Sequence, residues 1–302
     1  MRNLKYRTGA ERISWLFSRE GLRKIVSVMK ELPLFSMILL SVFMFLGIFG
    51  EFIAPHDPTR TNLGAVLLPP FWVEGGTTAY ILGTDPLGRD ILSRLISGAR
   101  ISIEVGFAVV IIAGTIGTVV ALLSGYLGGK IDGLLMRLCD IFLSIPYLMI
   151  AIVLAAVLGP SKENIIIILI ILGWAGYARV LRGEVLRVKE GDFVRLAVIA
   201  GCSQTRIMVR HIFPNIVNTL IILATLQLGT VIIAEASLSF LGLGVPPPTS
   251  AWGSMCADGR NYIFDAWWIS LWPGFTIMLV VLSCNFLGDW LRVRLDPKFR
   301  QI

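Results

Sequence analysis

The chain has 302 residues, of which 55% are hydrophobic and only 16% are charged, and its mean hydropathy is +0.77. Soluble domains carry charge on about a quarter of their residues, so this composition excludes an ordinary soluble protein and indicates a membrane protein. Apolar runs recur along the whole chain without a compositional break, which predicts one membrane domain, residues 34–302, rather than two soluble domains.

Residues 1–33 form a basic segment with eight Lys or Arg against three acids. Positive segments stay on the inner side of a membrane, so we expect this segment in the cytoplasm and the first span running outward. A cleaved signal peptide would have a shorter apolar region that ends at a small-residue site, whereas this run ends at "FIAPHDP".

A helix needs about 20 apolar residues to cross a bilayer, and five runs come close to that length. A sixth run, 165–181, is shorter and reaches the inner interface if Arg179 and Arg182 extend to it. The sequence therefore predicts an all-α, multi-pass membrane protein with six transmembrane helices and both termini in the cytoplasm. The five longer runs are 34–53, 101–124, 134–158, 216–240 and 269–291.

This topology places most basic residues inside, so the net charge of +7 needs no nucleic acid to explain it. The inner segments are 125–133, 182–215 and 292–302, and the outer ones are 54–100, 159–163 and 241–268. The first outer segment is rich in Pro, Gly and Thr and then becomes amphipathic around Ile91–Ile96. We expect a short interfacial helix there, opening near Asp85 or Asp90.

Charged side chains inside spans need a partner or a purpose. Arg137 and Asp140 lie three residues apart near the inner end of the third span, which predicts an ion pair between them. Glu235 lies in the outer half of the fifth span, two turns after Gln227. Two interpretations remain open for Gln227 and Glu235: they line a transport pathway, or they form a buried hydrogen bond between helices.

The sequence offers no catalytic or cofactor site. The two histidines, His56 and His211, are predicted on opposite sides of the membrane, which argues against catalysis by a histidine triad. The segment "GYLGGK", 125–130, has three residues between its outer glycines rather than four, and Ile131 follows its lysine where a phosphate-binding loop has Ser or Thr. We interpret it as a tight turn between spans and expect neither metal nor cofactor in this chain.

The inner segment "RLAVIAGCSQTRIMVRHIFPN", 195–215, has the spacing of a helix-turn-helix, with Ala197 at the crossing, Gly201 in the turn and Ile207 packing the second helix. A DNA reader also needs a supporting core, which the adjacent spans leave no room for. We therefore expect a compact basic hairpin at the inner face. Pro214 is predicted to end its second helix, so that motion of the hairpin passes into spans four and five.

This hairpin resembles the coupling segment, or EAA loop, of the membrane subunits of ABC importers. Arg195, Leu196 and Ala197 stand at the Glu-Ala-Ala positions, Gly201 at the glycine, and His211 to Pro214 near the end. The sequence departs from the pattern where Arg195 replaces an acid, Leu196 an alanine and Phe213 a leucine.

Two further motifs resemble the C-type permease subunit of the dipeptide, oligopeptide and nickel subfamily. The first is "GTDPLGRDILSRLISGARISI", 83–103, and the second comprises 234–255 and 285–300. The resemblance implies that the first motif lies on the side of the solute-binding protein. Its candidate residues are Gly83, Asp85, Gly88, Arg89, Asp90 and Arg94.

The resemblance implies the type I ABC importer fold in a prokaryotic inner membrane. It also implies four kinds of partner: a B-type permease subunit, two ATPase subunits that hold ATP and Mg²⁺, a solute-binding protein outside, and the lipid bilayer. Peptides are the expected substrate, while nickel or other metal chelates, glutathione and oligosaccharides are alternatives. A stand-alone secondary transporter or channel would show repeated halves with embedded charges, and an intramembrane enzyme would show paired catalytic groups; neither pattern is present.

Two mutational expectations follow. Gly201→Asp is expected to uncouple ATP hydrolysis from uptake, because its Cβ would wedge the turn. Charge reversal at Arg89 or Arg94 is expected to weaken docking of the binding protein.

Overall fold

The computed structural model describes residues 33–295, and the predicted basic segment lies, apart from Pro33, outside the described residues. The described chain is helical, and its one β-bridge pairs Thr84 with Asp90. Five helices are long and apolar enough to span a membrane, and a bent pair, α5 with α6, makes up to six. The helices are α3 Leu34–Ile53, α4 Ile91–Leu127, α5 Gly129–Ser144, α6 Tyr147–Leu158, α7 Lys162–Lys189, α8 Asp192–Ile199, α9 Gln204–Ile207, α10 Phe213–Phe240, α11 Trp252–Gly259 and α12 Trp268–Leu295, with short turns η2 Leu63–Ala65, η3 Met208–Ile212 and η4 Arg260–Tyr262.

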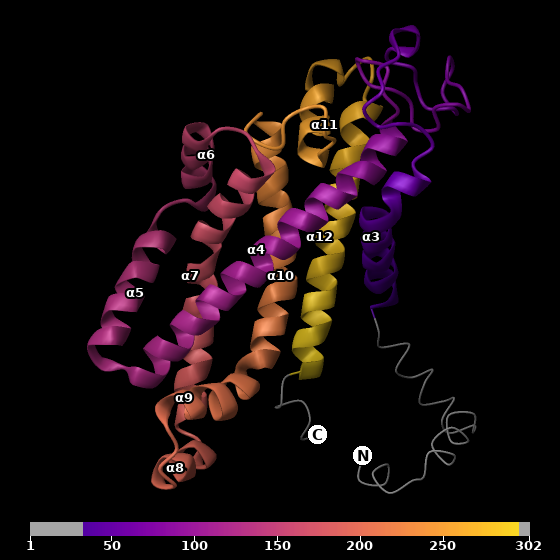
Figure 1. Ribbon diagram of the computed structural model, residues 1–302. Coiled ribbons are helices and arrows are strands. Elements are labelled where there is room, and N and C mark those ends of the chain that lie inside the picture. The colour runs from indigo at the N-terminus through magenta and orange to yellow at the C-terminus, as the bar shows by residue number, and fades with distance from the viewer. Residues whose placement is uncertain (1–32, 296–302) are drawn as a thin grey trace, which may run out of the picture.

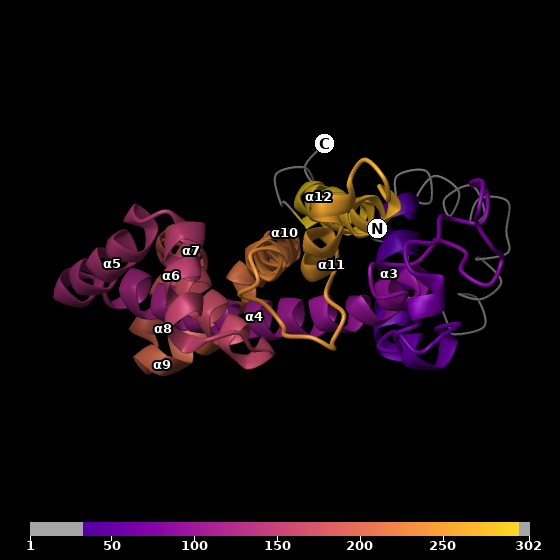
Figure 2. The same cartoon turned by 90° about the horizontal axis from the view of Figure 1, so that it is seen from above.

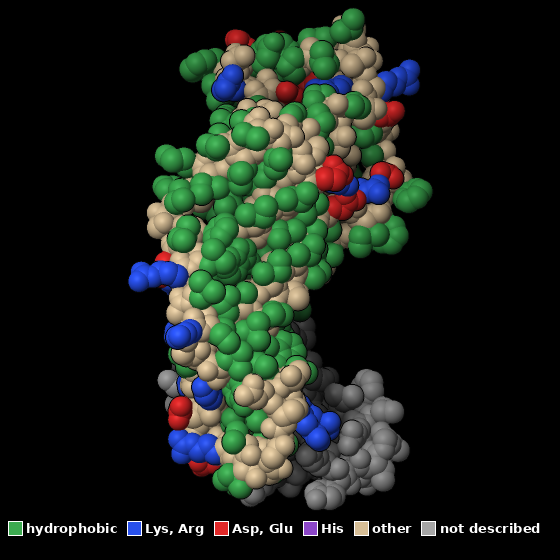
Figure 3. Space-filling view, turned by 60° about the vertical axis from the view of Figure 1, so that its left-hand side comes forward, with side chains coloured by type: hydrophobic (Ala, Val, Ile, Leu, Met, Phe, Trp, Pro, Cys, Tyr) green, Lys and Arg blue, Asp and Glu red, His purple; other side chains and the backbone are tan. Residues whose placement is uncertain are grey.

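The long helices run between two ends of the molecule (Figure 1). One end, here the hairpin end, carries α8 and α9, and the start of α3 and the end of α12 lie toward it. The other, the motif end, carries the segment 54–90 and α11. In Figure 3 apolar side chains cover most of the visible face, and charged side chains gather mostly toward the two ends. This distribution is typical of a protein whose middle lies in hydrocarbon.

The prediction of one continuous helix for the third span is wrong. The run 134–158 is broken between α5 and α6, whose axes differ by 84°. Ile145 is extended and Pro146 caps α6 without a side-chain hydrogen bond. A proline lacks the N–H that would continue α5, and it biases the residue before it away from helix. Figure 1 shows that α5 and α6 together still carry the chain from the hairpin end toward the motif end.

The second predicted span is longer than expected. The interfacial helix predicted near Asp90 does begin there, because the Asp90 carboxylate accepts a hydrogen bond from Ser93 N at 2.9 Å. It does not end, however, but continues as α4 for 37 residues, or about 55 Å. The charged Glu104 within this helix is paired: it accepts from Arg100 at 2.9 Å and from Lys162 at 2.7 Å.

Helix α4 is the central helix of the bundle, in contact with most of the other long helices, and it packs closely on α7. A methyl group on Gly117 would lie 2.7 Å from Trp174 O, so only glycine lets the two helices approach this far. Seen from above, α5, α6 and α7 lie toward one end of α4 and α3 toward the other, with α10 and α12 alongside its middle (Figure 2). The predicted short span 165–181 is the central part of α7, which has 28 residues.

The predicted ion pair between Arg137 and Asp140 is wrong. Asp140 pairs instead with Arg179 of α7, and Asp132 of α5 accepts two hydrogen bonds from Arg182, each at 2.6 Å. The two arginines that were expected to extend to the interface therefore tie α7 to α5. Within the "GYLGGK" segment the chain turns tightly between α4 and α5, as predicted, with Gly128 and Gly129 both at positive φ.

Candidate functional site

In the structure the hairpin comprises residues 190–212, between α7 and α10, instead of the predicted 195–215, and it is anchored at the end of α7. Lys189 Nζ donates a hydrogen bond to Tyr126 O at the end of α4, at 2.7 Å. Helix α8 follows, the chain turns at Gly201, and Ser203 caps α9 by accepting from Arg206 N at 3.4 Å.

One face of the hairpin is buried, as the helix-turn-helix spacing predicts. Ala197 is 7% exposed and Ile207 1% exposed. They pack with Val185 of α7 and with Ile212 and Ile216, all fully buried. This small core fixes α8 against both α7 and α10.

The opposite face of α8 is apolar and exposed. Leu196 is 64% and Ile199 81% exposed, and Phe193 and Val198 are also exposed. Apolar side chains that crowd one exposed surface mark an interaction site. Arg195, on the same short helix, pairs with Glu190 at 3.0 Å. The EAA pattern has an acid at the position of Arg195. Here that position is basic, but the carboxylate of Glu190 lies beside it.

Two expectations about the hairpin backbone are wrong. Gly201 does have a positive φ of 72°, but a Cβ there would meet nothing within 4 Å, so an aspartate would not wedge the turn. Pro214 does not end the second helix, since Gln204–Phe240 is one continuous helix. A π-helical segment, Met208–Ile212, widens the helix just before the proline, and Phe213 N donates to Met208 O five residues back. Such a widened turn accommodates a ring that a regular α-helix excludes. His211, within this segment, is half-buried.

At the motif end, glycines shape a tight loop. Gly83 and Gly88 have φ values of 85° and 71°, where glycine is strongly favoured. A Cβ on Gly88 would lie 1.9 Å from Asn62 O, and one on Gly83 would lie 2.6 Å from Leu68 O. Thr84 between them is fully buried, and its carbonyl accepts from Trp268 Nε1 at 3.1 Å. The loop is therefore packed against the start of α12.

Two arginines of the motif are buried between two carboxylates. Asp85 is fully buried and accepts from Arg89 Nε at 2.6 Å and from Arg94 Nη1. Asp258 of α11 accepts from Arg89 Nη2 at 3.2 Å and from Arg94 Nη2 at 3.0 Å. The sequence did not single out Asp258, because 164 residues separate it from Arg94. Arg89 and Arg94 thus face this cluster and not solvent, so reversing their charge would first disturb the loop itself.

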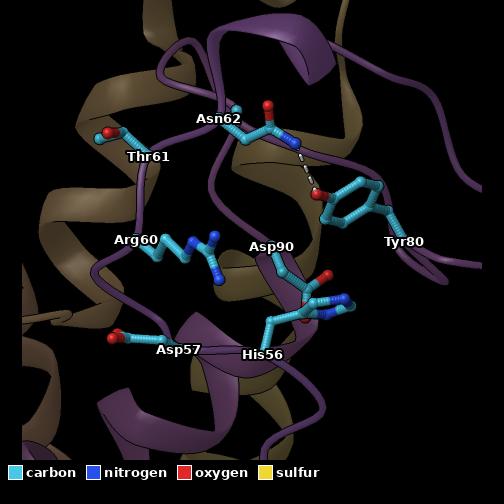
Figure 4. A pocket seen from close by; sticks show the side chains of 8 residues that line it. His56, Asp57, Arg60, Thr61, Asn62, Tyr80 and Asp90 are labelled. Carbon is cyan, nitrogen blue, oxygen red and sulfur yellow. Dashed lines mark hydrogen bonds and ion pairs between the residues drawn. The ribbon is translucent and has the colours of Figure 1, made fainter.

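Asp90 takes part in a different group. Its Oδ2 accepts from Ser93 N and Oγ, and His56 Nδ1 lies 3.5 Å away. The His56 ring stacks on Tyr80 at 5.0 Å between centroids. His56, Tyr80 and Asp90 line a hollow of about 340 Å³. Figure 4 shows the Arg60 side chain directed into it and the Asp57 carboxylate directed away.

The two candidate pathway residues differ in exposure. Glu235 is 1% exposed, and its Oε1 accepts from Ser239 Oγ at 2.7 Å, one turn along the same helix. It therefore lines no open space in this conformation. Gln227 is half-buried. Within residues 33–295 no three His, Cys, Asp or Glu side chains come together as a metal site would require.

Two family models match this chain. Residues 116–301 match the family described as binding-protein-dependent transport system inner membrane component. Residues 30–70 match the N-terminal TM domain of oligopeptide transport permease C.

Three relatives illustrate the similarity. The chain is 41% identical to the di/tripeptide transport system permease protein DppC of Pseudomonas aeruginosa over 264 residues, 87% of either chain. It is 40% identical to the probable D,D-dipeptide transport system permease protein DdpC of Escherichia coli over 277 residues, 91% of either chain. It is 38% identical to the dipeptide transport system permease protein DppC of Bacillus subtilis over 265 residues, 87% of this chain and 81% of the relative. With a family match over more than half its length and relatives this similar, the chain belongs to the inner membrane components of binding-protein-dependent transport systems.

Proposed function

We propose that this chain is one of two permease subunits of an ABC importer that carries short peptides into the cell, and that residues 34–302 form its permease domain. The relatives reported above are named as permeases for dipeptides or for di- and tripeptides, which supports peptides as the substrate. Metal chelates, glutathione and oligosaccharides remain the alternatives that the subfamily resemblance leaves.

The hairpin end faces the cytoplasm in this proposal. The strongly basic residues 1–33 precede α3, and the start of α3 and the end of α12 both lie toward the hairpin end (Figure 1). Basic segments are retained on the inner side, so both termini and the hairpin share it. The motif end then faces the solute-binding protein.

The exposed apolar face of α8 is the observation that carries the proposal. Leu196 and Ile199 project from a short helix whose other face is fixed to α7 and α10. Such a rigid, apolar projection is suited to a cleft in a partner, and we propose that the partner is an ATPase subunit that binds ATP and Mg²⁺. A B-type permease subunit would complete the pathway beside this chain.

Coupling follows from the continuity of the backbone. The helix Gln204–Phe240 extends from the hairpin to the motif end without interruption, so displacement of α8 by the ATPases would move α10 directly. ATP-driven closure would favour an outward-open arrangement and hydrolysis would release it. The hairpin and the pathway are then two sites that bias one equilibrium.

Reconstitution tests this function. The complete importer, with its partner subunits and binding protein, is placed in vesicles, and uptake of radiolabelled dialanine and ATP hydrolysis are measured for Leu196→Ser and Ile199→Ser. We expect uptake to fall while the subunit remains in the membrane. Leu134→Ser is the matched control, because Leu134 is 73% exposed on α5 and lies outside the hairpin. Full uptake by a variant carrying both hairpin substitutions would exclude the docking role.

A further inference from the structure

A cavity of about 540 Å³ lies among α7, α10 and α12 on the hairpin side of the bundle. Its lining includes Glu184 and Arg187 from α7, Asn218 and Thr219 from the first turns of α10, and Arg292 from the last turn of α12. Its volume lies within the range typical of small-molecule sites. Since Asn218 follows the hairpin by a few residues, the cavity is adjacent to the proposed coupling element.

Polar groups in this cavity have unused hydrogen-bonding capacity. Within the described residues, no hydrogen bond or ion pair engages the side chains of Asn218, Thr219 or Arg292. Glu184 receives both hydrogen bonds from Arg187 on Oε2, at 3.0 Å from Nε, which leaves Oε1 without a partner in the described part of the chain. A lipid acyl chain would leave these groups without hydrogen bonds, so the cavity is suited to a polar ligand.

The remaining walls are apolar. Val180 contributes from α7, Ile222 and Leu226 from α10, and Leu295 from α12. The cavity therefore combines a guanidinium and a carboxylate oxygen that have no partner among residues 33–295, a side-chain amide and aliphatic surface. A zwitterion that contains an amide and small side chains has the matching set of groups.

We propose that this cavity is a binding site, on the cytoplasmic side of the pathway, for a short peptide with free amino and carboxyl ends. Arg292 would bind the peptide carboxylate, Glu184 the ammonium group, and Asn218 the peptide amide, which needs one acceptor and one donor. The aliphatic walls would accept different side chains with little discrimination. The inference rests on the proposed function, because it assumes a peptide importer with the hairpin inside.

Cysteine protection in inverted membrane vesicles tests the site directly. The complete importer carries Asn218→Cys or Thr219→Cys, with the two partly exposed native cysteines, Cys202 and Cys256, replaced by alanine. A negatively charged methanethiosulfonate reagent is added on the hairpin side with or without dialanine, and without binding protein or ATP. We expect both cysteines to react, and dialanine at about twice its dissociation constant to slow the reaction about threefold.

Two controls define the site. N-acetyl-dialanine amide keeps both alanine residues and the peptide bond but carries neither charge, so it should give no protection. The second control is Ile221→Cys on the same helix. Ile221 is 42% exposed but does not line the cavity, and it lies within the predicted span 216–240. Its exposed side is expected to face hydrocarbon, which a charged reagent does not enter, so this cysteine should not be modified. Arg292→Gln and Glu184→Gln should each abolish protection while leaving Asn218→Cys reactive.

Three results would overturn the proposal. They are an unreactive cysteine at both 218 and 219, equal reaction rates with and without dialanine, and equal protection by the capped analogue. The second result would identify the cavity as a water-filled passage without affinity. Uptake of dialanine by the same preparations, measured with binding protein and ATP, reports separately on the proposed function, so a transporting importer without protection rejects only the site.

Discussion

Arg94, at the start of α4, contacts Asp258 of α11 with Nη2 and Oδ2 3.0 Å apart, and its other terminal nitrogen contacts Asp85. One buried guanidinium thus connects the glycine-rich loop before α4 to the segment between α10 and α12. These two segments form the surface of the motif end, so the contact fixes the surface that the binding protein is proposed to meet.

The two carboxylates of this cluster should differ sharply in importance. Asp85→Asn leaves Arg89 and Arg94 buried with one charged partner instead of two, and we expect a loss of about 3 kcal/mol or more in stability. Asp258→Asn removes a carboxylate that is 36% exposed, and we expect about 1 kcal/mol or less. Thermal unfolding of the purified importer in nanodiscs measures both. Equal losses would show that burial does not govern the energetics of this cluster.

Apolar patterning predicts the membrane spans, but it does not predict which distant residues form ion pairs. Apolar length located α3 and the central parts of α10 and α12, because a span needs about 20 apolar residues wherever it occurs. The helix-turn-helix spacing identified the buried face of the hairpin. Partners distant in sequence were not predictable: the i,i+3 rule assigned Asp140 to Arg137, whereas the fold brings Arg179 to it. The run 134–158 is apolar on both sides of Pro146, so hydropathy alone predicts one span where the proline breaks the helix.

The α4–α7 crossing should tolerate no side chain at Gly117. Gly117→Val would force its side chain against Trp174 O and Tyr177 Cβ, which lie 2.7 and 2.5 Å from a Cβ at this position. We expect the helices to separate at a cost of about 1 to 3 kcal/mol, with a lower unfolding temperature. Gly176→Val on α7 is the matched control, because a Cβ there meets nothing within 4 Å. Equal unfolding temperatures for the two variants would contradict close packing at this crossing.

Cys256 should react slowly with alkylating reagents. Burial raises the pKa of its thiol to about 11, and its Sγ lies 3.8 Å from Ser270 O. The thiolate is the reactive form, so at pH 8 we expect alkylation by iodoacetamide on the order of a hundredfold slower than for an ordinary cysteine. Because the raised pKa delays deprotonation, the rate should continue to rise as the pH increases through 10. A rate that reaches its plateau near pH 9 would show that α11 leaves this thiol open to water.

Gly201 should be required for its backbone conformation and not for lack of space. Its φ is 72° and a Cβ would meet nothing, so Gly201→Asn, which adopts this conformation readily, should retain most uptake. Gly201→Val should distort the turn at a cost of about 1 to 2 kcal/mol and displace the exposed face of α8, which lowers uptake and ATPase association together. Gly183→Val, at a helical position of α7 with equally open surroundings, controls for the added side chain. If the asparagine variant fails as completely as the valine variant, the turn is limited by contacts with the ATPase and not by φ.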